Sequence, residues 1–201
     1  MTIRLLDLLS QFREANDRES ENAYFRTRVP WVAPLAYLNI VYKPAPQEVL
    51  NDAMRRLSIP RVFSEFLAVQ NGAILFSGAL SIYGAVRPSQ LLNRSDPFSL
   101  PPFSLDDHNE VSSLPHADSF FTIGQYGFDG TRVCVHRGPL GVHLFEKGGT
   151  ELTAMETPTW KGLDEWLTSE VSRLSVLFDS DGHRLVNELE TLPQLRARKP
   201  S

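Results

Sequence analysis

Residues 57–72 read LSIPRVFSEFLAVQNG, and this stretch decides how the middle of the chain folds. Pro60 suits the first position of a helix, where a missing backbone N–H costs nothing. The apolar side chains that follow recur at helical spacing: Val62, Phe63, Phe66 and Leu67. Asn71 and Gly72 tolerate the left-handed conformation that closes a helix. The stretch therefore predicts a helix over residues 59–71 that packs through its aromatic face and then turns into a sheet.

Further helices and several strands are expected on both sides of this stretch. Apolar spacing predicts helices over residues 2–12, 49–57 and 160–178, the last with a continuous apolar face. Short apolar runs bounded by turn residues predict strands near residues 36–42, 74–76, 80–83, 119–124, 131–137, 142–146 and 151–155. The charged residues 13–28 predict a connector. Because the connections between strands are short, neighbouring strands should be antiparallel.

We therefore expect an α+β fold. It consists of a single, mainly antiparallel sheet of about five or six strands with flanking helices, plus an N-terminal helical extension. The 201 residues, 42% of them hydrophobic, suit one domain with extensions and are enough for a real core. We divide the chain into an N-terminal extension (1–44), a main domain (45–182) and a C-terminal tail (183–201).

The main domain contains a Pro- and Ser-rich insertion, residues 88–119, that concentrates negative charge. Its one base is Arg94, and its five acids give an excess equal to the whole net charge of -4: Asp96, Asp106, Asp107, Glu110 and Asp118. Proline removes backbone donors and serine competes for backbone bonds, so irregular structure is expected. Such a loop is either a solvated insertion or a functional segment. In the second case, the candidate partner-binding residues are Asp106, Asp107 and Glu110.

No residue pattern points to catalysis or to a metal. Adjacent acids such as Asp106 and Asp107 on a loop are usually solvated, because catalysis needs groups held rigidly at defined separations. Three acids match positions 1, 3 and 12 of a calcium loop: Asp179, Asp181 and Glu190. Arg184, however, stands where that loop needs glycine. The sequence contains neither a phosphate-binding loop nor a nucleophile motif. We therefore expect no enzyme activity, no cofactor and no metal.

Cysteine content and charge limit the compartment and the partners. A single cysteine, Cys134, cannot form an internal disulfide, which excludes a disulfide-stapled secreted domain. Asp7 interrupts the first apolar run, which is too short for a signal peptide, and no stretch reaches the roughly 20 apolar residues of a membrane span. A net charge of -4 gives no general attraction to nucleic acid or anionic lipid. We expect a cytoplasmic protein with a protein partner, and neither nucleic acid nor membrane as a direct one.

The stretch at residues 57–72 also resembles the signature of the SUKH superfamily. The residue pairs of that signature occur in the expected order: Ile59-Pro60, Phe66-Leu67, Asn71-Gly72 and Tyr83-Gly84. Later residues are similar to its second block and closing helix: Phe121-Thr-Ile123-Gly124, Asp129-Gly130 and Trp166-Leu167. The resemblance covers residues 45–182. None of these side chains is a reactive group, so the resemblance identifies a fold rather than a chemistry.

The SUKH superfamily includes fungal Smi/Knr regulators of cell-wall synthesis and many bacterial toxin-immunity proteins. The resemblance implies a SUKH-like α+β domain that binds protein and needs no cofactor. The leading hypothesis is an immunity protein that binds and neutralises a cognate bacterial toxin domain, for example a nuclease. A basic nuclease surface would suit the acidic insertion, since complementary charge speeds association. The alternative is a regulatory or scaffold protein of the Smi/Knr type.

Overall fold

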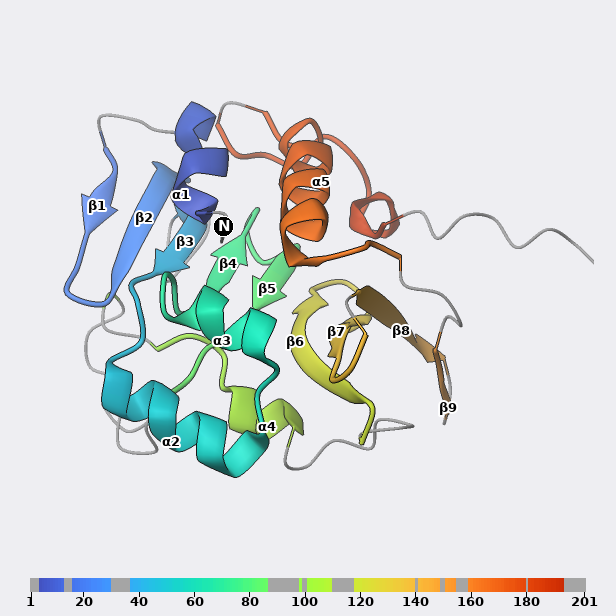
Figure 1. Cartoon of the computed structure of the whole chain (residues 1–201). Helices are drawn as coiled ribbons and strands as arrows, with labels where there is room; N and C mark the ends of the chain where they lie inside the picture. Colours follow the sequence, from blue (N-terminus) through green and yellow to red (C-terminus); the bar gives the residue numbers. More distant parts are fainter. Residues whose placement is uncertain are drawn as a thin grey trace, which may run out of the picture.

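A single antiparallel sheet forms the centre of the molecule (Figure 1). The computed structural model describes residues 4–12, 16–29, 37–86, 98, 101–109, 118–139, 141–148, 151–154, 159–179 and 181–193. Within them the sheet has nine strands, which lie side by side in chain order from β1 to β9. The strands are β1 (Arg18–Glu19), β2 (Ala23–Arg28), β3 (Tyr37–Tyr42), β4 (Ala73–Leu75), β5 (Leu80–Ile82), β6 (Phe120–Tyr126), β7 (Arg132–His136), β8 (Val142–Gly148) and β9 (Glu151–Ala154).

The α+β class and the antiparallel sheet are confirmed, but the expected five or six strands are too few. The segment 13–28, expected as a connector, contains β1 and β2. In β2 the buried side chains alternate with more exposed ones, and the buried set is Ala23, Phe25 and Thr27. This period of two is the mark of a strand with one buried face. Two of the charges that suggested a connector, those of Arg26 and Arg28, lie on its other face.

The described helices are α1 (Leu5–Leu8), η1 (Ser10–Phe12), α2 (Gln47–Leu57), α3 (Arg61–Leu67), α4 (Leu105–Asn109), α5 (Leu163–Ser175) and η4 (Leu189–Thr191). The helices expected near α2, α3 and α5 are confirmed, with Pro60 as the N-cap of α3, one position before its first helical residue. The N-terminal helix is shorter than expected, and α4 lies inside the insertion that we expected to be irregular. None of the helices in the described ranges is long and apolar enough to cross a membrane.

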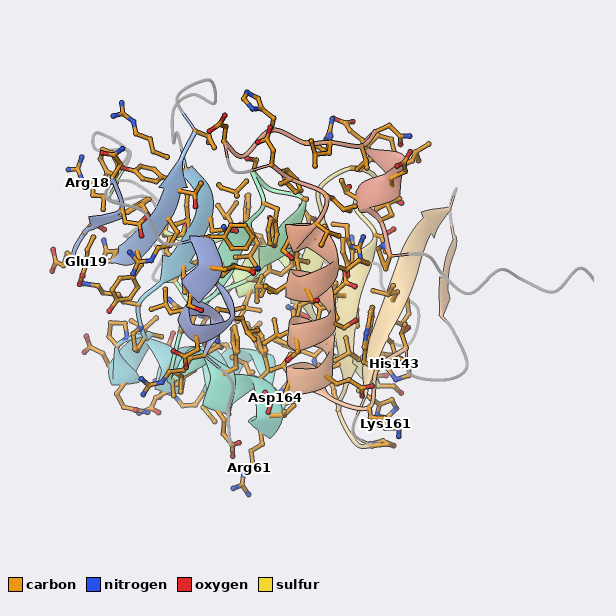
Figure 2. All side chains as sticks on the ribbon, turned by 90° about the horizontal axis from the view of Figure 1, so that it is seen from above. Arg18, Glu19, Arg61, His143, Lys161 and Asp164 are labelled. Atoms are coloured by element: carbon orange, nitrogen blue, oxygen red, sulfur yellow. The ribbon has the colours of Figure 1, made fainter. Side chains whose placement is uncertain are left out.

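One large apolar core joins α1, α2, α3 and α5 to the same face of the sheet (Figures 1 and 2). Phe66 of α3 is fully buried, as the sequence predicts, and its ring stacks on Phe63 with the centroids 5.4 Å apart. Phe63 also contacts Phe121 of β6. The opposite side of α3 faces solvent, where Arg61 projects from its first turn (Figure 2). Burying such an aromatic side chain contributes about 1.5–3 kcal/mol.

Three of the residues that carry the SUKH resemblance, Asn71, Gly72 and Gly84, lie where the chain before β4 packs against the chain at the end of β5. The side-chain amide of Asn71 donates to the carbonyl oxygen of Ala85 and accepts from its N–H, both at 2.8 Å. Gly72 has a φ of 89°, and a Cβ there would lie 2.6 Å from the carbonyl oxygen of Ile82. A Cβ on Gly84 would lie 2.3 Å from the carbonyl oxygen of Asn71. These residue types are therefore required by close backbone packing.

The other face of the sheet carries smaller apolar clusters. One of them joins Phe25 and neighbouring residues of β2 and β3 to Phe98 of the insertion. The rings of Phe25 and Phe98 pack edge to face, 5.2 Å apart, and the guanidinium of Arg18 lies 3.6 Å above the Phe98 ring. The insertion therefore contacts the sheet at Phe98 as well as at α4.

Candidate functional site

The candidate partner-binding residues of the insertion lie on and beside α4. The carboxylate of Asp106 pairs with the guanidinium of Arg56 on α2, whose Nε also donates to Asp52 at 3.0 Å. The hydrogen bond with Asp106 raises the pKa of Arg56 further above its ordinary value. Asp107 is exposed, and Glu110 lies outside the described residues. The structure therefore uses Asp106 to hold α4 against α2 and leaves Asp107 at the surface.

Two further contacts fix α4 to the sheet. The side-chain amide of Asn109 donates to the carbonyl oxygen of Thr122 on β6 and accepts from its N–H, both at 2.9 Å. The ring of His108 stacks on Tyr83 with the centroids 4.0 Å apart. Burial, with the positive charge of Arg132 nearby, lowers the pKa of His108. The α4 segment is thus a docked part of the fold.

A cleft of about 540 Å³ opens where the β4–β5 and β6–β7 turns meet the chain after α5. The segment after α5 includes η4, which is the short red turn beside α5 in Figure 1. The lining residues are Phe76, Ser77, Gly78, Ala79, Gly127, Phe128, Phe178, His183, Arg184, Val186, Glu188 and Thr191. Its volume falls within the range of about 300–1,000 Å³ that is typical of binding pockets. Residues 183–191 belong to the segment that we expected to be a tail, but they form one wall of this cleft.

The β4–β5 turn has an unusual backbone. Phe76, Ser77 and Gly78 have left-handed φ angles of 52°, 54° and 88°. Residues other than glycine rarely adopt this region, and such strain gathers at functional sites. Two backbone donors tie the turn to β3: the N–H of Phe76 donates to Asn39 Oδ1 at 3.0 Å, and that of Ser77 to the carbonyl oxygen of Leu38 at 2.8 Å. The fold therefore holds this wall of the cleft in a defined shape.

The two turns touch each other through their backbones at Gly127. Its N–H donates to the carbonyl oxygen of Ala79 at 3.1 Å. A Cβ on Gly127 would lie 2.1 Å from the carbonyl oxygen of Gly78, so a side chain there would push the turns apart. The next residue, Phe128, is 44% exposed. The close contact of the two turns thus places the ring of Phe128 at the cleft, where the ring remains exposed to solvent.

Apolar side chains form much of the cleft and its surroundings. The ring of Phe76 packs against Phe12 at 5.5 Å and against Phe178 at 5.4 Å. Among the described residues, the large apolar side chains that are exposed are Met54, Phe103, Phe128, Val176, Leu185 and Leu189. Four of these six belong to the β6–β7 turn or to residues 176–189, the segments that build the cleft. Phe128 lines the cleft, and the other three lie on the chain that forms its opposite wall, so exposed apolar surface occurs on both segments.

A buried ionic network holds the C-terminal wall in place. The carboxylate of Glu170 on α5 is 1% exposed and lies 2.6 Å from Nη2 of Arg173. It also accepts a hydrogen bond from the hydroxyl of Tyr126 at 2.7 Å. Arg173 donates to the carbonyl oxygens of Thr191 at 2.8 Å and Leu192 at 3.4 Å. A buried charge needs this kind of pairing, so α5, β6 and the C-terminal segment are coupled.

Negative charge predominates around the cleft. Residues 127–130 and the described part of residues 176–193 contain one guanidinium, that of Arg184, and five carboxylates: Asp129, Asp179, Asp181, Glu188 and Glu190. Nη2 of Arg184 lies 3.1 Å from Oε1 of Glu188. The excess of carboxylates is as large as that of the insertion, yet it comes from two segments far apart in the sequence.

The cleft also contains the residue types of a Ser–His–Asp triad. Ser77 and His183 line it, and Nδ1 of His183 lies 3.3 Å from Oδ2 of Asp179. The backbone N–H of His183 donates to Asp179 and lowers the pKa of its carboxyl. The two paired side chains are 54% and 36% exposed, whereas the aspartate of a triad is buried to orient its histidine. We therefore interpret Asp179 and His183 as a pair that closes a surface loop.

Two of the three acids that partly match a calcium loop have other contacts. Asp179 accepts from His183, and the carboxylate of Glu190 accepts from the side-chain amide of Asn187. In the ranges that the structure describes, no three His, Cys, Asp or Glu side chains gather as a metal site. Cys134 is fully buried, and burial raises the pKa of its thiol to about 12, which makes it a poor nucleophile at neutral pH.

Comparison with known proteins adds no relative to this description. No protein-family model matches the chain, and no curated protein matches it. A functional proposal therefore rests on the cleft, on the surface charges and on the resemblance carried by residues 57–72.

Proposed function

We propose that the protein is a non-enzymatic protein-binding module and that the cleft receives its partner. The cleft itself carries this proposal, because it combines an open cavity of about 540 Å³ with an exposed aromatic ring, Phe128. Aromatic anchors dominate binding energy at protein interfaces. The strained β4–β5 turn and the Glu170–Arg173 network hold the walls before a partner arrives, which reduces the entropy lost on binding.

Within this class, we propose a cytoplasmic SUKH-type immunity protein that binds and neutralises a bacterial toxin domain. The mutual packing of Asn71, Gly72 and Gly84 supports the resemblance, since it gives these residue types a shared structural purpose. The carboxylates around the cleft favour a nuclease as the toxin, because nucleases carry basic surfaces and complementary charge accelerates association.

A toxin-protection assay tests the proposal. The chain is co-expressed with toxin domains encoded beside its gene, while survival is scored and binding is measured by calorimetry. We expect a stable complex with one of them and restored growth. Phe128→Ser should lose both, whereas Asp107→Asn on α4 should keep both, since both residues are exposed and neither change disturbs the core.

Two other results would contradict the proposed immunity function. A specific partner unrelated to toxins would support the regulatory or scaffold role of the Smi/Knr type. Turnover of a substrate by the purified chain, lost in Ser77→Ala or His183→Ala, would contradict a non-enzymatic module.

A further inference from the structure

We infer that the cleft binds a basic, apolar segment of a protein partner, an extended stretch in which Lys or Arg alternates with bulky apolar residues. This inference rests on the proposed protein-binding function and goes further by naming the chemistry of the bound segment.

The apolar part of the segment follows from the lining of the cleft. Phe76 and Phe178 are almost fully buried beneath it, while Phe128 and Val186 remain accessible at its sides. An apolar side chain that packs beside Phe128 and Val186 removes its own surface and the surface of these two residues from water. This favours binding in proportion to the area buried. The bulky residues of the partner therefore act as anchors.

The basic part follows from the carboxylates on both walls. Asp129 follows Phe128 on the β6–β7 turn, and Glu188 lines the opposite segment between Asp181 and Glu190. Glu188 pairs with Arg184, so the excess of negative charge on these segments comes from the acids beside the lining residues, namely Asp129, Asp179, Asp181 and Glu190. Lys and Arg suit this place, because their methylene stems cover apolar surface while their charged ends reach the acids. The same acids repel the phosphates of nucleic acid, so a protein segment is the favoured occupant.

The acids near α4 provide a contrasting surface without this combination. The guanidinium of Arg56 pairs there with both Asp106 and Asp52, and Arg55 adds a second guanidinium 3.2 Å from Asp52. Two guanidiniums thus offset most of the charge of Asp52, Asp106 and Asp107, whereas the described cleft segments have one guanidinium, paired with Glu188, for five carboxylates. A basic segment gains less there than at the cleft.

Peptide titration of the full-length, 15N-labelled chain tests the inference. Three eight-residue peptides are compared by NMR: one alternating Lys and Leu, one alternating Glu and Leu, and one alternating Lys and Ala. We expect the Lys/Leu peptide to shift the amides of residues 76–79, 127–129 and 183–190. It should bind at least about tenfold more tightly than either of the others in low salt. Raising NaCl from about 0.1 M to about 1 M shortens the Debye length from about 10 Å to about 3 Å and should weaken binding.

Matched charge variants test whether the acids near the cleft contribute to binding of the Lys/Leu peptide. Asp181→Asn with Glu190→Gln removes two acids near the cleft, and Asp107→Asn with Glu65→Gln removes two exposed acids elsewhere. We expect roughly fivefold weaker Lys/Leu binding for the first pair in low salt and no change for the second. Unchanged thermal midpoints would show that both variants fold.

Three results would overturn the inference: amide shifts on α2 and α4 instead of the cleft, equal binding of the Glu/Leu peptide, or equal effects of the two variant pairs. Its failure is distinguishable from failure of the proposed function. Toxin protection together with peptide shifts outside the cleft would keep the function and reject this site. A cleft that binds the Lys/Leu peptide in a chain that protects against no toxin would keep the site and reject the immunity role.

Discussion

The α4 region and the cleft both contain carboxylates, but they use them for different purposes. On α4, Asp106 pairs with Arg56 and helps to dock one helix against another. At the cleft, Asp181 and Glu190 lie on a segment that also exposes Leu185 and Leu189. A carboxylate paired within the fold stabilises it, whereas carboxylates beside exposed apolar groups suit recognition. The comparison shows that the density of charge in the sequence does not reveal whether a carboxylate pairs within the fold or lies beside exposed apolar groups.

Removing the buried ion pair that holds the C-terminal wall of the cleft should have the largest effect on the free energy of unfolding. Arg173→Ala leaves the buried carboxylate of Glu170 without its guanidinium and frees the carbonyl oxygens of Thr191 and Leu192. Removing one partner of a buried pair costs about 3–5 kcal/mol, and we expect the lower end because the Arg173 side chain is 26% exposed. Urea unfolding measures the loss.

Arg184→Ala is the matched control for that change, since its pair with Glu188 is exposed. It should change the free energy of unfolding by less than about 0.5 kcal/mol. Equal losses in the two variants would contradict a structural role for the buried network.

Breaking the attachment of α4 should have the next largest effect. Asn109→Ala removes two hydrogen bonds to the backbone of Thr122 and leaves both of its groups without that partner. We expect a loss of about 1–3 kcal/mol and faster amide exchange in α4. Binding of the Lys/Leu peptide should be unchanged, because α4 is not part of the cleft lining. A loss of peptide binding at full folding would mean that the two regions are coupled.

The pH dependence of stability tests a further contact of α4, the stacking of His108 on Tyr83. The folded state lowers the pKa of His108, mainly through burial, so the unfolded chain binds a proton more readily. Stability should be complete above the ordinary histidine pKa of about 6.5 and fall as the pH drops below it, by at most about 1.4 kcal/mol per pH unit for one proton. His108→Phe keeps a ring on Tyr83 and should flatten this dependence. An unchanged slope in that variant would assign the pH dependence to other groups.

The smallest effect is expected for the ion pair between Arg56 and Asp106. A double-mutant cycle with Arg56→Gln and Asp106→Asn should give a coupling of about 0.2–1 kcal/mol that decreases with salt, because the pair is partly exposed. A coupling larger than the loss measured for Asn109→Ala would show that α4 depends on this pair more than on Asn109.

Much of the fold was predictable from local patterns. The apolar spacing of α2, α3 and α5 and the turn residues between β6, β7, β8 and β9 indicated these elements close to their observed bounds. The helix before Asn71 and Gly72 ends earlier than predicted, at Leu67, and these two residues instead lead the chain into β4. Each of these signals lies within a few residues, so the backbone preferences that produce them can be read without knowing the rest of the structure.

The candidate site was less predictable. The sequence pointed to Asp106, Asp107 and Glu110 because they cluster within five positions, and it treated the residues after 182 as a tail. It also treated the residues of β1 and β2 as a connector, because their charges were more conspicuous than the alternation of Ala23, Phe25 and Thr27.

The sequence by itself determined the class of the fold, most of the helices, and the hairpins. Only the tertiary structure decided that Phe76, Phe128 and Val186 share a cleft and that the acid of Glu170 is buried. The physical reason is the distance along the sequence over which each signal acts. Helical and strand periods act over a few residues, whereas a cleft depends on where the sheet brings segments separated by tens of residues. The packing of the sheet and α5 therefore determines where the cleft lies, and no local pattern could do so.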